Sequence, residues 1–554
     1  MNSVLRARSA VSVIVSSDRR GGAARAVGRA LRAYSEYVLL TQQPGYEPLR
    51  IDTQSGEVLF ILSVGYDLLC GSMTPHQKET ARTRLFEVAE ICRDYLGEER
   101  RDFAQAHFLG CGLGLLAFSF LFWDEHPRAA EWASRLRGAF DVTLRLLPAD
   151  GFYPHGINLW IYEFGQLLRW LELFRVCSGE DLWRSTPGIP NASEFRGATL
   201  SPDGLHGVTM GDPQFRVGGD SWCHFLIASR TGSQTAQWVG EKLLDLPHAG
   251  VDVRNVPARR RVYEFLYYDP SVGTQSPAAL HFPDGGQVCV REGSTLFVYR
   301  SGPPLGAQCY GAGEYGGYGH SDPCNGAFLI YAGQTFVASG PGPVYRRDSA
   351  LHNLVTINGQ GQVGDSTVWM PDFLPPEVLA GRPEVRSERG CILLSAETAP
   401  AYLPHLGVVQ CRRAVCVSGG SFVLGVDVVQ CREVSSIEWN AHSWSPFARI
   451  PGELRFELDA GVRLLILDPT TGSWETGVSE YIPAYPNPGK CEHRMRVWVN
   501  AREARFVWCY LLEDLLPPVI EREPELRCVF PGGPVVRFDG ERLIPAVTET
   551  REKP

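Results

Sequence analysis

Residues 286–299 read GQVCVREGSTLFVY, in which two apolar segments of alternating pattern flank a turn at Gly293. Val288 and Val290 lie two positions apart, the spacing that places side chains on one face of a strand. The same period of two recurs downstream between Gly, Pro, Asn and Asp residues, at 295–299, 327–331, 335–338, 353–357, 391–394, 422–429, 462–467, 495–499 and 506–511. Short strands separated by turn residues are typical of an antiparallel β-sandwich, which we predict over residues 266–554.

The chain before residue 245 follows a helical period instead. Residues 55–69 place apolar side chains on one stripe, and Thr74-Pro75 is a typical start for the next helix. Helices are predicted at 55–69, 75–96, 107–122, 127–147, 159–177, 221–231 and 235–244. We therefore expect a helical domain of stacked hairpins at 51–245, an N-terminal tail and first helix at 1–50, and a linker at 246–265.

Composition excludes several classes of protein. The chain has 554 residues, of which 44% are hydrophobic and 21% charged, as in an ordinary globular protein. Its net charge of −9 is opposite to that of a protein that tracks nucleic-acid phosphates, so no nucleic-acid partner is expected. The longest apolar run, 110–123, is too short to span a bilayer and predicts a buried helix.

The cysteines and the N-terminus bear on the compartment. Fifteen cysteines, an odd number without a C-x-x-C pair, favour buried thiols in a reducing compartment. The N-terminal segment MNSVLRARSAVSVIVSSDRR has a weakly apolar stretch and no small-residue cleavage site. These features favour a cytoplasmic location, with the periplasm or secretion as the alternative.

Three places along the chain carry side chains suited to chemistry. His107 and Tyr162 lie near the starts of predicted helices, whose ends converge in stacked hairpins, although each could equally be a cap or a core residue. A glycine-rich loop at 311–322 presents Tyr315, Tyr318 and His320, and could simply be a long hairpin connection. His352 follows at the mouth of a strand, and with His320 it could supply two ligands of a tetrahedral metal site. The chain contains no G-x-S-x-G, H-E-x-x-H, phosphate-loop or dinucleotide signature.

The order of these segments resembles the heparinase II/III and alginate-lyase group of polysaccharide lyases. Five stretches carry the likeness: SGEVLFILSVGYDLLCGSMTP (55–75), DGFYPHGINLWIYEFGQLL (150–168), GHSDPCNGAFLIYAG (319–333), ALHNLVTINGQGQ (350–362) and WNAH (439–442). The resemblance implies an α+β multidomain fold, in which an N-terminal (α/α) toroid precedes a C-terminal antiparallel β-sandwich. The first hairpins of the toroid are short or missing here, so the toroid is expected to be incomplete.

The resemblance also implies an activity, the β-elimination of uronic-acid polysaccharides or oligosaccharides. This reaction needs a neutralised uronate carboxylate, a base for the C5 proton and an acid for the leaving oxygen. By resemblance, His107 is the base or the carboxylate partner, and Tyr162 is the acid, or both acid and base. Tyr318 takes the place of the catalytic histidine on the sandwich loop. Tyr153, His155, Trp160 and Tyr315 are expected to bind substrate.

The metal site of the zinc-carrying members is altered. His320 and His352 match two of its ligands, but Gly340 stands where the family has an aspartate. A zinc ion is therefore not expected to be tightly held, and no other cofactor is implied. Ala106 likewise replaces the asparagine that precedes the toroid histidine, and His155 replaces an acidic residue.

Other functions of the same scaffold remain open. A uronate C5-epimerase would remove the same proton and return one to the other face, and a glycoside hydrolase would use carboxylate pairs. A non-catalytic glycan-binding protein would retain aromatic side chains without turnover. In each case the partner is an acidic polysaccharide or oligosaccharide, and a homodimer is one open assembly state.

Overall fold

A computed structural model describes most of the chain. The residues it describes are 53–97, 105–208, 210–211, 219–244, 258–277, 281–312, 319–341, 347–367, 374–451, 454–468, 472–479, 492–522 and 525–546. These residues form two compact units, which we treat separately. The helical unit consists of the described residues of 53–147 and 159–186, and the sheet unit of those of 148–158, 187–312 and 319–546. The predicted N-terminal tail, 1–50, lies outside the described residues.

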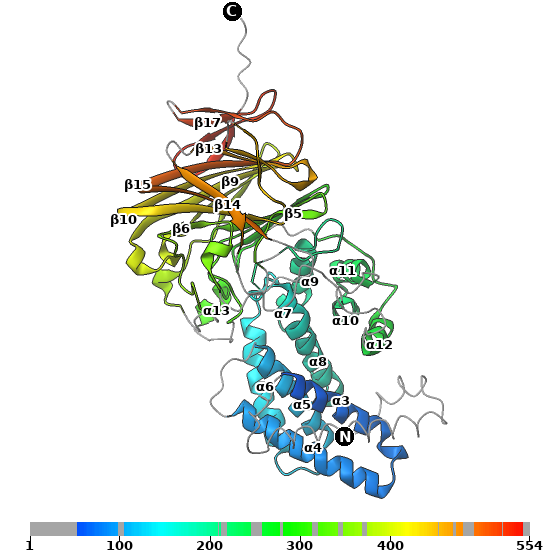
Figure 1. The fold of residues 1–554 in the computed structure, drawn as a ribbon. Coiled ribbons are helices and arrows are strands. Elements are labelled where there is room, and N and C mark those ends of the chain that lie inside the picture. The colour runs from blue at the N-terminus through cyan, green and yellow to red at the C-terminus, as the bar shows by residue number, and fades with distance from the viewer. Residues whose placement is uncertain are drawn as a thin grey trace, which may run out of the picture. The chain divides into compact units, whose positions relative to one another are not determined.

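The helical unit begins with four long helices (Figure 1). They are α3 (Thr53–Leu69), α4 (Pro75–Leu96), α5 (Ala106–Leu121) and α6 (Ala129–Leu146). Thr74 starts α4 as predicted: its hydroxyl accepts from the backbone N–H of Gln77, whose side chain bonds back to the backbone N–H of Thr74. This reciprocal cap and the following Pro75 are local sequence signals, which explains why the start of α4 could be predicted from the sequence.

Helix α5 is the centre of the helical unit. It contacts α3, α4, α6 and α8 (Gly165–Leu173), and its side chains from Phe108 to Phe118 are buried. The burial confirms the expectation from its apolar sequence. Glycines let α3 approach closely, because a Cβ on Gly56 would lie 2.1 Å from the backbone oxygen of Gly110.

The segment at 157–178 is one irregular helix. Short α7 (Ile157–Leu159) leads into a π-helical turn, η2 (Trp160–Phe164), then α8, then a second π-helical turn, η3 (Phe174–Ser178). Each π-turn inserts an extra residue, so it shifts the faces of the helix, and such turns are frequent at functional sites. Tyr162 lies in the first of them.

Helices also belong to the sheet unit. They are α9 (Gly188–Ala198), α10 (Ser221–Thr231), α11 (Gln234–Leu244), α12 (Ala258–Tyr267) and α13 (Ala307–Ala312). Helix α12 occupies the second half of the predicted linker. Asp220 lies at the N-terminus of α10, but its side chain makes no cap and instead pairs with buried Arg196, Oδ2 to Nε 2.8 Å.

In the described part of the chain the strands form three antiparallel sheets rather than the two of a simple sandwich. One five-stranded sheet has the order β1-β2-β3-β4-β5, and a four-stranded sheet has the order β16-β17-β18-β19. The large sheet follows β11-β12-β13-β15-β10-β9-β8-β7, with β14 also paired to β15 and β6 to β10. In Figure 1 the long strands β10 and β15 run side by side through the middle of this unit.

The first sheet contains β1 (His281–Phe282), β2 (Gln287–Glu292), β3 (Thr295–Arg300), β4 (Ala327–Ala332) and β5 (Thr335–Ala338). The large sheet contains β6 (Val355–Ile357), β7 (Glu384–Glu388), β8 (Cys391–Glu397), β9 (Val408–Ser418), β10 (Phe422–Ser443), β11 (Ala448–Arg449), β12 (Arg455–Glu457), β13 (Arg463–Asp468), β14 (Ser473–Val478) and β15 (His493–Leu511). The last sheet contains β16 (Val519–Glu521), β17 (Leu526–Val529), β18 (Val535–Phe538) and β19 (Leu543–Ala546).

The large sheet is the middle layer, buried on both faces. Val415 of β9 packs into the core shared with the five-stranded sheet, whereas its neighbours Ala414 and Cys416 pack into the core shared with the four-stranded sheet. Since each face meets a core, the first part of β10, 422–429 (FVLGVDVV), carries near-continuous apolar residues rather than the period of two expected there. Within the layer, Gly425 leaves room for the ring of Trp508, which a Cβ would approach to 2.0 Å.

Two further expectations concern the whole chain. The cysteines that the structure describes are thiols, and most of them are buried, as expected. In the described part of the chain, no helix combines the length and the apolar character needed to cross a membrane.

Candidate functional site

His107 lies in the first turn of α5 and is half-buried. Its Nδ1 shares a hydrogen bond of 3.1 Å with the hydroxyl of Tyr95, which projects from the last turn of α4. A partner at Nδ1 fixes the plane of the imidazole ring and directs Nε2 away from Tyr95. Sequence reasoning missed Tyr95, because nothing in the sequence shows which residue of α4 faces His107.

Tyr162 is half-buried on the π-turn η2, and η2 contacts α5. Helix α8 is held against α5 as well, because the indole Nε1 of Trp170 donates to the Leu109 carbonyl at 2.9 Å. Thus His107 and Tyr162, 55 residues apart in sequence, lie on contacting elements of the helical unit.

Trp160 does not have the surroundings expected of a sugar-binding ring. It is fully buried and stacks on Phe164, with ring centroids 4.9 Å apart and planes at 8°. Its ring therefore contributes to packing in this structure and offers no exposed face to a sugar.

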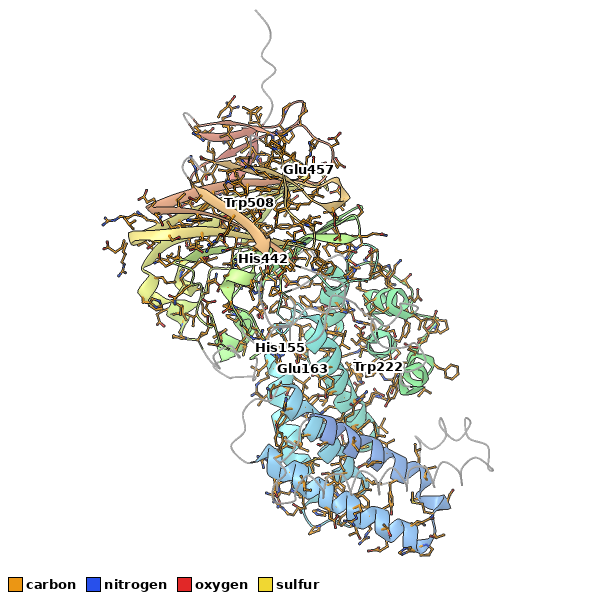
Figure 2. The ribbon with its side chains drawn as sticks, viewed as in Figure 1. His155, Glu163, Trp222, His442, Glu457 and Trp508 are labelled. Carbon is orange, nitrogen blue, oxygen red and sulfur yellow. The ribbon has the colours of Figure 1, made fainter. Side chains whose placement is uncertain are left out.

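The sheet unit brings three other predicted residues together. The ring of His155 lies 5.6 Å from that of Tyr153 and 5.5 Å from that of His320, measured between centroids. A hydrogen bond from a side chain to the backbone joins these two loops, because the Ser321 hydroxyl donates to the Pro154 carbonyl at 3.2 Å. His155 and Tyr153 are buried, and Figure 2 labels His155 at the start of the segment that leads into α7. Tyr315 and Tyr318, by contrast, lie outside the described residues.

The two predicted metal ligands do not form a metal site with their described neighbours. His352 is buried, its Nε2 is 3.7 Å from Asp322 Oδ2, and burial lowers its pKa. Arg347 pairs with the same carboxylate, so a cation already balances Asp322. A Cβ on Gly340 would lie 3.7 Å from His352 Nδ1, so the position at which the resemblance implies an aspartate adjoins this histidine. No three His, Cys, Asp or Glu side chains in the described part of the chain gather closely enough to hold a metal ion.

A buried polar cluster next to His352 escaped sequence reasoning. His442, the last residue of the WNAH stretch, shares hydrogen bonds with the Ala350 carbonyl (2.9 Å) and the Ser479 hydroxyl (3.0 Å) (Figure 2). Glu492 Oε2 is 3.8 Å from His442 Nδ1, and its Oε1 accepts from the Ser339 hydroxyl at 2.8 Å. Burial raises the pKa of Glu492 to about 8 and lowers the pKa of His442 to about 3, so both groups are neutral near pH 7.

The raised pKa of Glu492 predicts a pH-dependent stability. Because its folded pKa exceeds the ordinary 4.5, the native state holds this proton better, and the free energy of unfolding should fall as pH rises from 4.5 to about 8. The Glu492→Gln variant, whose amide does not titrate, should lose this decline, which is on the order of a few kcal/mol. The lowered pKa of His442 has the opposite effect, because it makes the free energy of unfolding rise as pH rises from about 3 to 6.5. The difference in stability between wild type and Glu492→Gln therefore isolates the contribution of Glu492. Denaturant titrations from pH 5 to pH 9 would measure it, and parallel pH profiles would contradict it.

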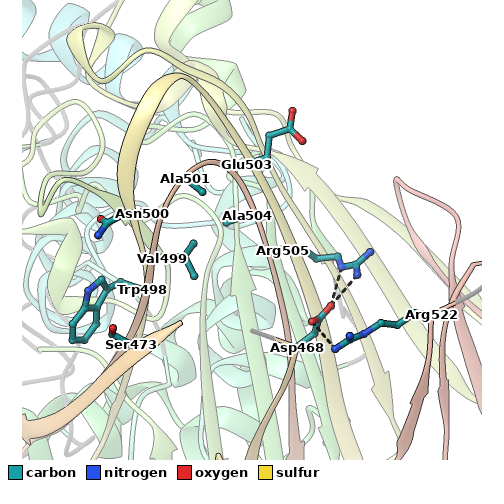
Figure 3. A pocket seen from close by; sticks show the side chains of 10 residues that line it. All are labelled: Asp468, Ser473, Trp498, Val499, Asn500, Ala501, Glu503, Ala504, Arg505 and Arg522. Carbon is teal, nitrogen blue, oxygen red and sulfur yellow. Dashed lines mark hydrogen bonds and ion pairs between the residues drawn. The ribbon is translucent and has the colours of Figure 1, made fainter. Parts of the chain in front are cut away.

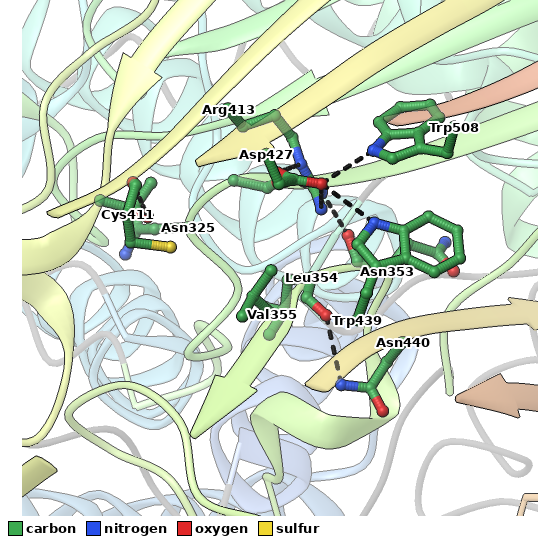
Figure 4. A network of polar contacts seen from close by, with 12 residues as sticks. Asn325, Asn353, Leu354, Val355, Cys411, Arg413, Asp427, Trp439, Asn440 and Trp508 are labelled. Atoms are coloured by element: carbon green, nitrogen blue, oxygen red, sulfur yellow. Dashed lines mark hydrogen bonds and ion pairs between the residues drawn. The ribbon is translucent and has the colours of Figure 1, made fainter. Parts of the chain in front are cut away.

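An ion pair at the centre of the sheet unit holds the strand that follows His352 (Figure 4). Arg413 and Asp427 pair through Nε–Oδ1 (2.6 Å) and Nη2–Oδ2 (3.0 Å), and both are buried. Arg413 Nη1 also donates to the backbone carbonyls of Asn353 (2.6 Å) and Gly326 (2.5 Å). This pair thereby fixes the segments that carry His352 and the loop leading to β4.

The comparisons with known proteins agree with this architecture. Residues 274–476 match the model of the heparinase II/III-like C-terminal domain family. Among solved structures, a crystal structure of heparinase III is similar with a TM-score of 0.59 and 14% identity, over 94% of this chain and 79% of that one. A heparan sulfate lyase HepC mutant from Pedobacter heparinus has a TM-score of 0.58 at 14% identity, over 94% and 78% of the two chains. A structure of a heparinase III, the BT4657 gene product, has a TM-score of 0.58 at 13% identity, over 90% of this chain and 74% of that one. The search of curated proteins finds no match.

Helices followed by stacked antiparallel sheets place the chain in the class of heparinase III-like folds. More narrowly, residues 274–476 match the family model of the heparinase II/III-like C-terminal domain. The match covers less than half of the chain, and identities of 13–14% carry the fold alone.

Proposed function

We propose that this protein is a polysaccharide lyase that cleaves an acidic, uronate-containing polysaccharide or oligosaccharide by β-elimination. The helical unit then belongs to an incomplete (α/α) toroid, and the sheets form the heparinase II/III-like C-terminal domain. One observation carries the proposal: His107, oriented by Tyr95, begins the helix that contacts the π-turn of Tyr162.

His107 supplies the base in this mechanism. With Nδ1–H donating to Tyr95, its Nε2 keeps a lone pair that can accept the C5 proton of a uronate. The first turn of α5 also carries the partial positive charge of the helix N-terminus, which favours a substrate carboxylate nearby.

Tyr162 supplies the acid. As His107 removes the C5 proton, the electron pair of that bond forms the C4–C5 double bond and the C4–oxygen bond breaks. The Tyr162 hydroxyl then donates its proton to the departing oxygen, leaving an alkene on one product and a hydroxyl on the other.

The near-ultraviolet absorbance of the conjugated, unsaturated uronate tests the reaction directly. Purified protein should raise the absorbance with one member of a panel of alginate, heparan, chondroitin, hyaluronan and glucuronan. A flat trace with folded protein would contradict the lyase. Solvent proton exchange at C5 without cleavage would then identify an epimerase, saturated products a hydrolase, and binding alone a glycan-binding protein. The cytoplasmic location and the homodimer stay predictions.

Tyr95 offers a sharper test of the proposed base. We expect Tyr95→Phe to lower kcat/KM roughly tenfold, the effect of losing one hydrogen bond of about 1–1.5 kcal/mol. The acidic limb of the pH–rate profile should move to lower pH, since the imidazolium loses an acceptor at Nδ1. Tyr66→Phe, a change of another half-buried tyrosine of the helical unit, is the matched control and should leave both unchanged. An unaltered pH profile in Tyr95→Phe would remove His107 from the base role.

A further inference from the structure

The outer edge of strand β15 opens into a pocket in the sheet unit. On this side β14 pairs with β15 only up to Trp498, and β13 pairs with it only from Val507. Between these points, residues 499–506 of β15 have no partner strand on this side among the described residues. A pocket of about 420 Å³ occupies the gap, a volume within the range of small-ligand sites.

Polar groups of several kinds line this pocket (Figure 3). Trp498 and Ser473 lie at one end, and Asp468, Arg505 and Arg522 lie at the other. Asn500 is exposed along the edge between them. An aromatic ring, an amide, a hydroxyl and guanidinium groups thus line one pocket, with the ring and the guanidinium groups at opposite ends.

The arginine end presents positive charge to solvent. Asp468 lies beneath, with a side chain only 4% exposed, and it binds Arg505 Nη2 at 2.9 Å and Arg522 Nη2 at 3.0 Å. The two arginine side chains remain 41% and 51% exposed. Each guanidinium has five N–H donors, and Asp468 takes two from Arg505 and one from Arg522, so further donors remain at the surface.

The remaining charges near the pocket are engaged elsewhere. Glu503 lines the pocket but accepts from Gln430 Nε2 at 2.9 Å and points away from the arginines in Figure 3. Arg496 lies over the ring of Trp498, 4.9 Å from its centroid, and pairs with Glu475 and Glu438. The anion-binding capacity is therefore concentrated on Arg505 and Arg522.

We infer that this pocket is a second binding site for an acidic oligosaccharide, separate in the chain from His107 and Tyr162. The carboxylate or sulfate of one unit binds Arg505 and Arg522, whereas another unit bonds through its hydroxyls to Asn500 and Ser473 and packs its ring beside Trp498. Guanidinium groups suit both anions, because their donors form a planar fork. The choice of a saccharide rests on the proposed function, but the arginines and the pocket do not. Such a site would hold a long chain that the helical unit acts upon.

The test uses the full chain labelled with 5-fluorotryptophan, in the Tyr162→Phe background to prevent turnover. The fluorine resonance of Trp498 is assigned by its loss in Trp498→Phe. We expect this resonance to shift on titration with a tetrasaccharide that contains glucuronate or with a sulfated tetrasaccharide. The tetrasaccharide that binds with the higher affinity identifies the anion. Neutral cellotetraose should cause no shift.

Matched variants locate the anion. Arg522→Gln should weaken binding at least about tenfold, the loss of a charge-assisted hydrogen bond. Arg502→Gln, which removes an exposed arginine of β15 that does not line the pocket, should leave the affinity unchanged. Arg505 is kept throughout, so Asp468 retains a partner in the folded protein.

The outcomes separate this inference from the proposed function. A Trp498 shift that depends on Arg522 supports the second site even if no substrate is eliminated. Absence of any shift with every acidic tetrasaccharide, or equal binding by Arg522→Gln and Arg502→Gln, overturns the second site even if the protein proves to be a lyase.

Discussion

Replacing Tyr162 with phenylalanine is expected to lower the rate of elimination by about 10²–10⁴, the usual contribution of a positioned general acid. The ring keeps its place on the π-turn η2, so only the proton donor is lost. The initial rate of near-ultraviolet absorbance, on the substrate chosen from the panel, measures the loss. KM should change much less than kcat, because the proton moves only as the C4–oxygen bond breaks.

Two variants make this result specific. Tyr268→Phe, at an exposed tyrosine of the sheet unit, should retain full activity. The rate of elimination by the double variant His107→Ala/Tyr162→Phe should be scarcely lower than that of the less active single variant. The effects of groups that act in one step on the rate are not additive. Full activity in Tyr162→Phe would show that another group protonates the leaving oxygen.

Asp427→Asn should produce the largest loss of stability, about 3–5 kcal/mol in the free energy of unfolding. It leaves the Arg413 guanidinium as an unpaired charge in the core. Asp427 Oδ2 also accepts from the indole Nε1 of Trp439 (3.0 Å) and of Trp508 (2.8 Å), as Figure 4 shows. A neutral amide cannot balance the guanidinium, and its NH₂ end adds a donor where only acceptors are needed.

Denaturant unfolding followed by tryptophan fluorescence measures this loss, because Trp439 and Trp508 report on the core itself. Glu384→Gln is the control, since it removes the exposed ion pair with Arg386, side chains 68% and 56% exposed. It should change the midpoint little, as surface pairs contribute about 0–1 kcal/mol. Equal stability of the two variants would mean that the core tolerates the charge of Arg413.

Local signals in the sequence account for most of the helices and strands that were predicted. Thr74, Pro75 and Gln77 define the start of α4, and the glycine at 232 ends α10 in a left-handed conformation. Helix α9 was missed because Gly188, Pro190 and Gly197 interrupt its helical pattern. It forms because tertiary contacts override propensity, among them the buried pair of Arg196 with Asp220 on the neighbouring helix.

The third sheet and the polar clusters required knowledge of packing that one sequence does not contain. A strand segment buried on both faces, such as 422–429 of β10, lacks the alternation that identifies which layer covers it. Tyr95 and Glu492 are ordinary residues in sequence, and only the approach of α4 to α5, or of β15 to the Ser339 turn, gives them partners. The helical pattern singles out His107 and Tyr162, and their helices lie in contact, whereas their catalytic roles come from the family resemblance and stay predictions.

The pairing of β10 with β15 has a consequence for synthesis of the protein. Phe422 aligns with Leu511 and Ser443 with His493. The long strand β10 therefore cannot pair on this side until β15, which follows it in the chain, has been synthesised. Until residue 511 has left the ribosome, a 22-residue strand presents an open edge, which is a template for association with other chains. Nascent or truncated chains ending between 443 and 493 should therefore aggregate and depend on chaperones, whereas those extending past Leu511 should not.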